Sequence, residues 1–260
     1  MVSGSSGGNL KYLLALLLLL LPSAVFASCK DAQLNKLSKE TGIKIHCDFN
    51  HKTYFPKSLL HNCGDASGID PEYDSSLPVS DSIRQFLNNY PKQVLSNHLE
   101  NIFILSKFKC GNYRMGGSYD RKSIYVSVYL GDMNEQEYYR SWYLKILHHE
   151  FSSILQEQNY SLLTNDLIQS VSGKDAYDPK ILEYCLLQIR GECISGSRTL
   201  YEKGFLHYYG KQSPENDFNI YAEYLFVEYE RLMGLADRYP LIDKKVKLFK
   251  KFYNDIGVHI

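Results

Sequence analysis

The sequence lacks an excess of charge of either sign. Its 260 residues include 29 basic and 29 acidic side chains, so the formal net charge is zero. The densest basic segment, residues 244–251, mixes lysines with apolar residues in the pattern of a solvated helix face: Lys244, Lys245, Lys247, Lys250 and Lys251. Because no basic patch is available to neutralise phosphates, the sequence argues against nucleic acid as a partner.

Long hydrophobic runs are absent after the first segment of the chain. Residues 13–21 are apolar, follow Lys11 and end at Pro22, which is the pattern of a signal peptide. We therefore predict a signal peptide over residues 1–27 and export to the periplasm, the cell envelope or the medium. The apolar run is about half of the ~20 residues that a membrane span needs. No later run approaches that length, so we expect no transmembrane span in the mature protein.

The chain also lacks a CxxC pair, which argues against a structural zinc knuckle. All six cysteines follow residue 27, and an exported chain meets an oxidising compartment in which thiols pair. Short separations favour Cys47 with Cys63 and Cys185 with Cys193, which leaves Cys29 with Cys110. Residues 26–29 also resemble a lipoprotein processing site, and a lipid anchor on Cys29 would instead leave one thiol free. The sequence leaves both pairing schemes open.

Periodic segments are few before residue 80 and frequent after it. We expect residues 28–79 to form a loop-rich, disulfide-stapled N-terminal extension, because turn-forming residues dominate there. Asn134 and Glu137 form a capping box ahead of a long helix. The remaining expected elements are short helices around residues 83–87 and 94–99, strands at 101–108 and 123–129, and helices at 179–190, 214–233 and 241–256. This order predicts an α+β fold, mostly helical, with a small antiparallel or mixed sheet.

One motif in the sequence indicates a catalytic site, but one of its characteristic residues is replaced. Residues 144–155 read LKILHHEFSSIL, in which His149 and Glu150 match the first half of HExxH. In that motif two histidines one helical turn apart bind zinc, and the glutamate takes a proton from the metal-bound water. Ser153 stands where the second histidine would be, and a serine hydroxyl is a weak zinc ligand.

Several segments around this motif resemble the small secreted zinc-binding metallopeptidases of bacteria, which are gluzincins with a zincin-like fold. The resemblance rests on GGSYDRKSIYVSV, YLKILHHEFSSIL, KGFLHYYGKQSPENDFNIYAEYLF and YPLIDKKVKLFKKFY, and it covers roughly residues 80–257. It implies a zincin-like domain over residues 80–260, with zinc as cofactor and a peptide or protein as substrate. By this resemblance His149 is a metal ligand, Glu150 is the general base, and the other two ligand positions fall on Ser153 and Asn216.

Two of the three implied ligands are therefore replaced by poor zinc ligands. Groups that could substitute for them lie nearby in the sequence: His148, His207, Glu215, Asp217 and Glu223. His148 points about 100° away from His149 around the helix axis. His207 also fits a packed histidine, and Tyr208 and Tyr209 fit either packing or stabilisation of an oxyanion.

Two functions follow from these observations. The first is peptide-bond hydrolysis by metal-activated water, with Glu150 as base and an altered ligand set around His149. The alternative is a catalytically inactive zincin-like binding protein of the cell envelope, in which an edge strand such as 123–129 receives an extended peptide.

Overall fold

The computed structural model describes residues 31–48, 50, 54–69, 78–128, 136–173, 176–187 and 193–260. The predicted signal peptide, Cys29 and the capping residue Asn134 lie outside these residues. In the described ranges, no helix combines the length and the apolar character that crossing a membrane requires.

A mixed sheet of six strands forms one layer of the molecule. Its strands are β1 (Lys44–His46), β2 (Ala66–Ile69), β3 (Asn101–Cys110), β4 (Tyr113–Arg114), β5 (Gly117–Asp120) and β6 (Ser123–Val128). Strand β3 is central and runs parallel to β1 and β6, whereas β2 and β4 pair with it in the antiparallel direction. At the edge, β5 pairs antiparallel with β6. The two predicted strands are thus confirmed as β3 and β6.

Helices make up the rest of the fold. They are α2 (Ala32–Thr41), α4 (Lys57–Cys63), α5 (Pro78–Asn88), α6 (Lys92–His98), α7 (Gln136–Gln158), α8 (Asn165–Ser172), α9 (Ile181–Leu187), α11 (Arg198–Glu202), the 3-10 turn η4 (Tyr209–Lys211), α12 (Pro214–Val227), α13 (Tyr229–Ala236) and α14 (Pro240–Asp255). The helix predicted over 214–233 is two helices, because the backbone leaves helical geometry at Glu228, where φ is −127° and ψ is 42°. The α+β class with a mixed sheet is confirmed.

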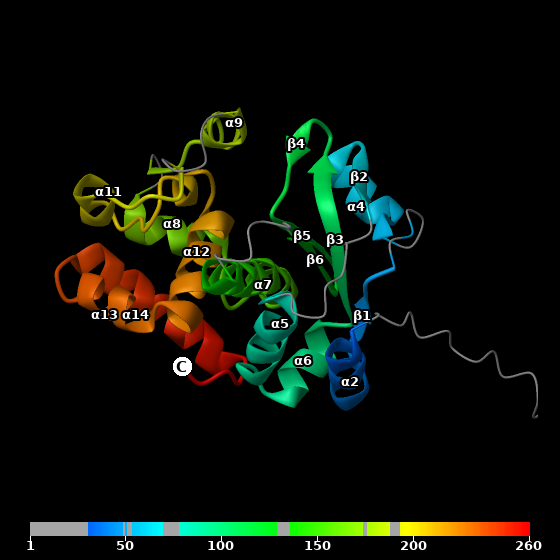
Figure 1. Ribbon diagram of the computed structural model, residues 1–260. Helices are drawn as coiled ribbons and strands as arrows, with labels where there is room; N and C mark the ends of the chain where they lie inside the picture. Colours follow the sequence, from blue (N-terminus) through cyan, green and yellow to red (C-terminus); the bar gives the residue numbers. More distant parts are fainter. Residues whose placement is uncertain are drawn as a thin grey trace, which may run out of the picture.

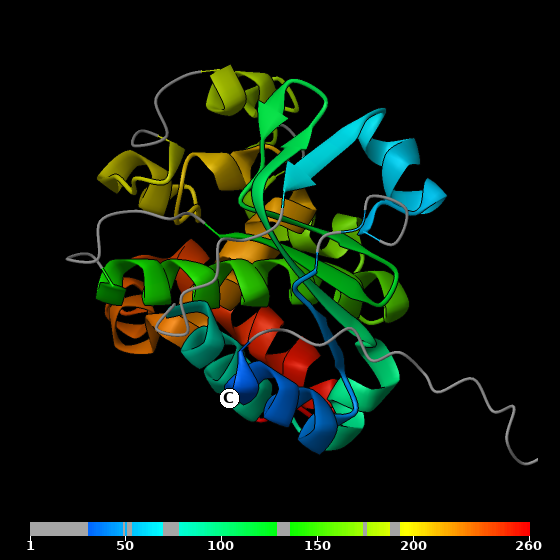
Figure 2. The ribbon, with the colours of Figure 1, turned by 45° about the vertical axis from the view of Figure 1, so that its right-hand side comes forward.

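The long helix α7 lies between the sheet and helices α8, α12, α13 and α14, whereas α4 lies beside the sheet (Figures 1 and 2). It packs against β5 and β6 on one side and against α5 and α12 on others. This position explains why few residues of α7 are exposed along the turns around His149. A helix that is covered on several sides places its polar residues against neighbouring elements, where each needs a partner.

Two apolar cores lie on opposite faces of the sheet. Along β3, Ile102 and Ile104 point into the larger core with α7, whereas Phe103 and Leu105 point into a smaller one with Tyr125. This alternation follows from the two-residue repeat of a strand. The sheet therefore presents only one of its faces to the helices that carry the histidine motif.

The segment expected to be a loop-rich extension is part of the sheet layer. Strands β1 and β2 both pair with β3, and α2 contributes Leu34 and Leu37 to the larger core. The prediction of a loop-rich segment is wrong for these residues, because short three- and four-residue strands give too little periodicity to be recognised.

One predicted disulfide is confirmed: Cys185 and Cys193 are bonded, with their Cα atoms 5.7 Å apart. Cys47 and Cys110 are also disulfide-bonded. Cys29 and the side chain of Cys63 lie outside the described part of the chain, so the pairing proposed for them stays a prediction.

The lysine-rich helix α14 is not solvated along its whole basic face. Lys245 is fully buried and its ammonium lies 2.5 Å from Asp217 Oδ2. The interpretation of residue 245 as part of a solvated stripe is therefore wrong. An internal carboxylate partner allows this cation to lie in the core.

Candidate functional site

The candidate site lies where α7 and α12 run side by side. On α7, His149 and Ser153 are four residues apart and Glu150 lies beside them. On α12, Glu215, Asn219 and Glu223 recur at the same spacing, so they form one face of that helix. This face of α12 is turned toward the histidine motif, because its side chains bond Ser153 and His149.

Ser153 and Asn219 are bonded directly across the two helices. The Asn219 side-chain amide donates to Ser153 Oγ over 2.7 Å, and Ser153 Oγ donates to Glu215 Oε1 over 2.7 Å. Ser152 Oγ approaches both Asn219 Oδ1 at 2.8 Å and the His149 carbonyl at 2.7 Å. Ser152, Ser153 and Asn219 are each at most 2% exposed. The network therefore satisfies the polar atoms of this buried contact.

One turn further along α12 from Asn219, Glu223 forms an ion pair with His149. The His149 Nδ1 lies 2.7 Å from Glu223 Oε1, and the two side chains are 16% and 14% exposed. Burial lowers the pKa of His149, but the hydrogen bond to Glu223 and the negative fields of Glu150, Glu223 and Glu215 outweigh it and raise the pKa to about 9. The imidazole is therefore protonated at neutral pH and supplies the positive charge between these carboxylates.

Glu223 and Glu215 each form a hydrogen bond in this cluster, whereas Glu150 forms none with a described residue. Burial raises its pKa, the His149 cation lowers it, and Glu215 and Glu223 raise it again, which gives a pKa of about 7. The backbone of β5 approaches it closely, because a Cβ built on Gly117 would lie 2.8 Å from Glu150 Oε1. Glu150 thus lies between helix α7 and the edge strand, half protonated near neutral pH.

Two tyrosines border the carboxylates. Tyr119 of β5 donates its hydroxyl to Glu215 Oε1 over 2.9 Å. The ring of Tyr209 in η4 lies 6.3 Å from the His149 ring. Burial raises the pKa of both hydroxyls, and the neighbouring carboxylates add to the effect, so both are neutral donors at neutral pH.

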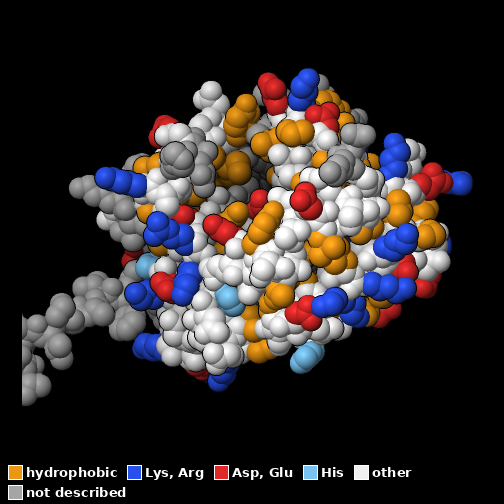
Figure 3. Space-filling view, turned by 180° about the vertical axis from the view of Figure 1, so that it is seen from behind, with side chains coloured by type: hydrophobic (Ala, Val, Ile, Leu, Met, Phe, Trp, Pro, Cys, Tyr) orange, Lys and Arg blue, Asp and Glu red, His pale blue; other side chains and the backbone are white. Residues whose placement is uncertain are grey.

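Figure 3 shows a hollow on the surface with hydrophobic walls and acidic side chains at its lower end.

The donor set does not fit zinc. A metal ion held by His149 and the residue one turn later would meet the face of α12 on which Asn219 bonds Ser153 and Glu223 bonds His149. Serine and asparagine offer neutral oxygens, and both side chains are already bonded to each other. Across the described residues, no group of three or more His, Cys, Asp and Glu side chains is arranged to hold a metal.

Other residues singled out in the sequence lie apart from this contact. Asn216, to which the resemblance assigns the third ligand, bonds the side chain of Gln212. Asp217 points to the opposite side of α12 and pairs with Lys245. His148 is buried between Tyr90 and Phe226, and burial lowers its pKa to about 3. Its imidazole is a neutral core group.

His207 is likewise a packed histidine rather than part of the cluster. It is 8% exposed, and its Nε2 lies 2.9 Å from the Tyr224 hydroxyl. Burial lowers its pKa to about 4.

Sequence reasoning missed Asn219 and the roles of Tyr119 and Gly117. A signal for Asn219 was present, since residues 215, 219 and 223 share the four-residue spacing of 149 and 153. Nothing in the sequence indicates that β5 lies over Glu150, because that contact joins distant segments of the chain.

The chain was compared with protein families, curated proteins and solved structures. No protein-family model matches the sequence, and no curated protein matches it. The chain is similar to the crystal structure of a "putative zinc-binding metallo-peptidase" from Bacteroides caccae ATCC 43185. The two share 16% sequence identity with a TM-score of 0.44, over 79% of this chain and 86% of that one. Similarity at this level assigns neither a family nor the role of any residue.

Proposed function

We propose that this chain is an exported protein that binds extended peptides along β5 without hydrolysing them. The observation that carries the proposal is the hydrogen bond between Ser153 and Asn219, because it engages the side chain at the second ligand position of the motif. His149 is already paired with Glu223, and among the described residues no three His, Cys, Asp or Glu side chains are arranged to hold a metal ion. Hydrolysis by metal-activated water has no support in this arrangement.

Peptide binding is supported by the position of β5 in the sheet. One edge of this strand pairs with β6, and in the described part of the chain no strand pairs with the other edge. The prediction that strand 123–129 is the docking edge is wrong, because this strand, β6, pairs with β3 on one side and with β5 on the other. An unpaired edge offers backbone N–H and C=O groups to an added strand.

The residues below β5 suit a peptide backbone. Gly117 leaves the strand without a side chain over Glu150, and Tyr119 is held toward α12 by Glu215. Glu150, with a pKa of about 7, donates or accepts a hydrogen bond at neutral pH according to its protonation state. It serves in this proposal as a polar contact for the bound peptide.

Export is supported by the leader pattern of residues 1–27 and by cysteines that are disulfide-bonded. The expected place of action is the periplasm, the envelope or the medium. A lipid anchor at Cys29 would keep the protein at the membrane surface.

The test combines metal content with peptide binding. The purified mature protein is dialysed against micromolar zinc, assayed for bound metal, and incubated with a library of unstructured peptides. We expect substoichiometric zinc, intact peptides, and slower amide exchange in residues 117–120 when a peptide binds. Stoichiometric zinc that is lost in His149→Ala, together with peptide cleavage, would overturn the proposal in favour of a metallopeptidase.

A further inference from the structure

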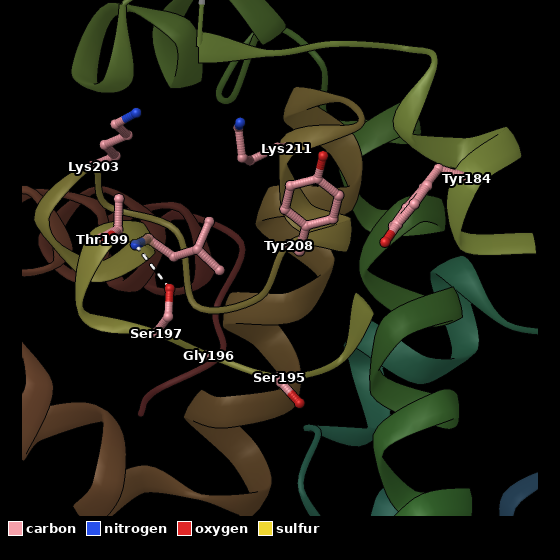
Figure 4. A pocket seen from close by; sticks show the side chains of 9 residues that line it. Tyr184, Ser195, Gly196, Ser197, Thr199, Lys203, Tyr208 and Lys211 are labelled. Atoms are coloured by element: carbon pink, nitrogen blue, oxygen red, sulfur yellow. Dashed lines mark hydrogen bonds between the residues drawn. The ribbon is translucent and has the colours of Figure 1, made fainter. Parts of the chain in front are cut away.

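A cavity lies beside η4, next to Tyr208 and apart from the His149 site. Its volume is about 490 Å³, which is in the range of sites for small ligands. Tyr208 lines it, whereas the next residue, Tyr209, packs toward His149. The remaining walls come from Tyr184 on α9, from the loop at residues 195–197, and from α11 (Figure 4).

The charged residues described on the walls of this cavity are all basic. Lys203 and Lys211 line it, and no acidic residue is among the described lining residues. Neither ammonium forms an ion pair with a described residue, and the Lys211 ammonium lies 5.4 Å from the centre of the Tyr208 ring. Figure 4 shows both ammonium groups at the same rim of the cavity. Two cations that line one small space, neither of them paired with a described residue, attract an oxyanion.

The other lining groups suit a hydroxylated ring. Tyr184 and Tyr208 stand edge to face, with ring centres 5.8 Å apart, and Tyr184 is 37% exposed. Side-chain hydroxyls of Ser195 and Thr199 also line the cavity. Exposed aromatic rings pack against the apolar faces of sugars, and hydroxyls exchange hydrogen bonds with them.

A disulfide fixes two walls of the cavity. Cys185 directly follows Tyr184, and Cys193 precedes Ser195 by two residues, so the Cys185–Cys193 bond ties these walls together. Such a cross-link limits how far the two segments separate. The cavity is thus held open by a covalent bond as well as by packing.

We propose that this cavity binds a small acidic sugar, that is, an oxyanion carried on a hydroxylated ring. The oxyanion lies between Lys203 and Lys211, and the ring lies against Tyr184 and Tyr208. Both uronic acids and sugar phosphates have this chemistry. An acidic peptide side chain shares the charge but lacks the hydroxylated ring that the tyrosines and hydroxyls fit.

Isothermal titration of the oxidised mature protein tests this proposal. The probes are glucuronate, glucose 6-phosphate, glucose, inorganic phosphate and a short glutamate peptide. We expect glucuronate or glucose 6-phosphate to bind at least about tenfold more tightly than the other three probes. Whichever of the two binds better identifies the source of the oxyanion.

Variants then locate the binding site. Lys203→Ala with Lys211→Ala should weaken binding about tenfold or more, whereas the exposed pair Lys39→Ala with Lys92→Ala should leave it unchanged. Cys185→Ser with Cys193→Ser should also weaken it. The proposal is overturned if neither acidic sugar binds at millimolar concentration, if glucose, phosphate or the peptide binds as tightly, or if the lysine variant binds normally. Binding of these probes depends neither on zinc nor on β5, so a failure of this proposal would not contradict the proposed function.

Discussion

Asn219 donates a side-chain hydrogen bond of 2.7 Å to Ser153, across the contact between α12 and α7. Ser153 stands one turn after His149, where the motif has its second ligand, and Asn219 lies opposite it on α12. Both side chains are buried, and each also bonds a further partner, Ser152 for the amide and Glu215 for the hydroxyl. The contact is therefore a complete polar network rather than a gap in a metal site.

Restoring two donors should create a metal site. The double variant Ser153→His with Asn219→Glu places an imidazole and a carboxylate beside His149, and Glu223 already bonds the Nδ1 of that histidine. We expect zinc affinity to rise at least about a hundredfold over wild type. Competition with a chromophoric chelator measures this change, and circular dichroism checks the fold.

A matched variant separates the two positions on α12. Ser153→His with Asn216→Glu places the new carboxylate where the family resemblance assigns the third ligand. Because Asn216 bonds Gln212 rather than Ser153, we expect little gain in zinc affinity from this variant. Equal zinc binding by both double variants would show that Asn219 is not the residue opposite the motif.

Protonated His149 should make stability fall at alkaline pH. Its pKa is about 9 in the folded protein and near 6.5 when unfolded, so its stabilisation is complete below about pH 6.5 and is lost as pH rises through 9. Urea unfolding at pH 7 and pH 9.5 should show a loss of about 2 kcal/mol attributable to this group. The His149→Gln variant should lose less stability over this interval, and an equal loss in both proteins would contradict the ion pair.

The close approach of β5 to α7 should make Gly117 intolerant of a side chain. A Cβ at this position would lie 2.6 Å from Ile146 Cγ2, so Gly117→Ala should cost about 1–3 kcal/mol of unfolding free energy. Gly234 on α13 has no atom within 4 Å of its added Cβ. The control Gly234→Ala should be neutral or stabilising by up to about 1 kcal/mol. Thermal unfolding of both variants compares them.

The buried pair of Lys245 and Asp217 should be sensitive to the loss of one partner. Burial raises the pKa of Asp217 and lowers that of Lys245, so each depends on the other to remain charged. Lys245→Met leaves the carboxylate with Tyr177 as its remaining side-chain partner, and we expect a loss of about 3–5 kcal/mol in urea unfolding.

Two further variants check the origin of that loss. Lys245→Met combined with Asp217→Leu should recover most of the stability, because no unpaired charge remains. Lys247→Met removes a lysine that is 75% exposed and pairs with Asp243 at the surface, and it should change stability by less than about 1 kcal/mol. A similar loss for Lys245→Met and Lys247→Met would show that the buried pair has no special role.

The sequence supplied the elements that have a strong local pattern. Strands β3 and β6, the long helix α7 and the Cys185–Cys193 bond follow from apolar periodicity or from short spacing. The short strands β1 and β2 were not predicted, because three or four residues carry too little periodicity. Their stability comes from pairing with β3, a partner more than thirty residues away along the chain.

The candidate site likewise has features that follow from local sequence and features that depend on tertiary contacts. From its own residues, the sequence determined that His149 lies one turn from a serine in place of a second histidine, because a helix fixes what stands four positions away. Only the tertiary structure decided which residues of α12 face that turn, that Asn219 bonds Ser153, and that the β5 backbone covers Glu150. Those contacts depend on how distant helices and an edge strand rotate and pack, and local sequence spacing does not encode that rotation.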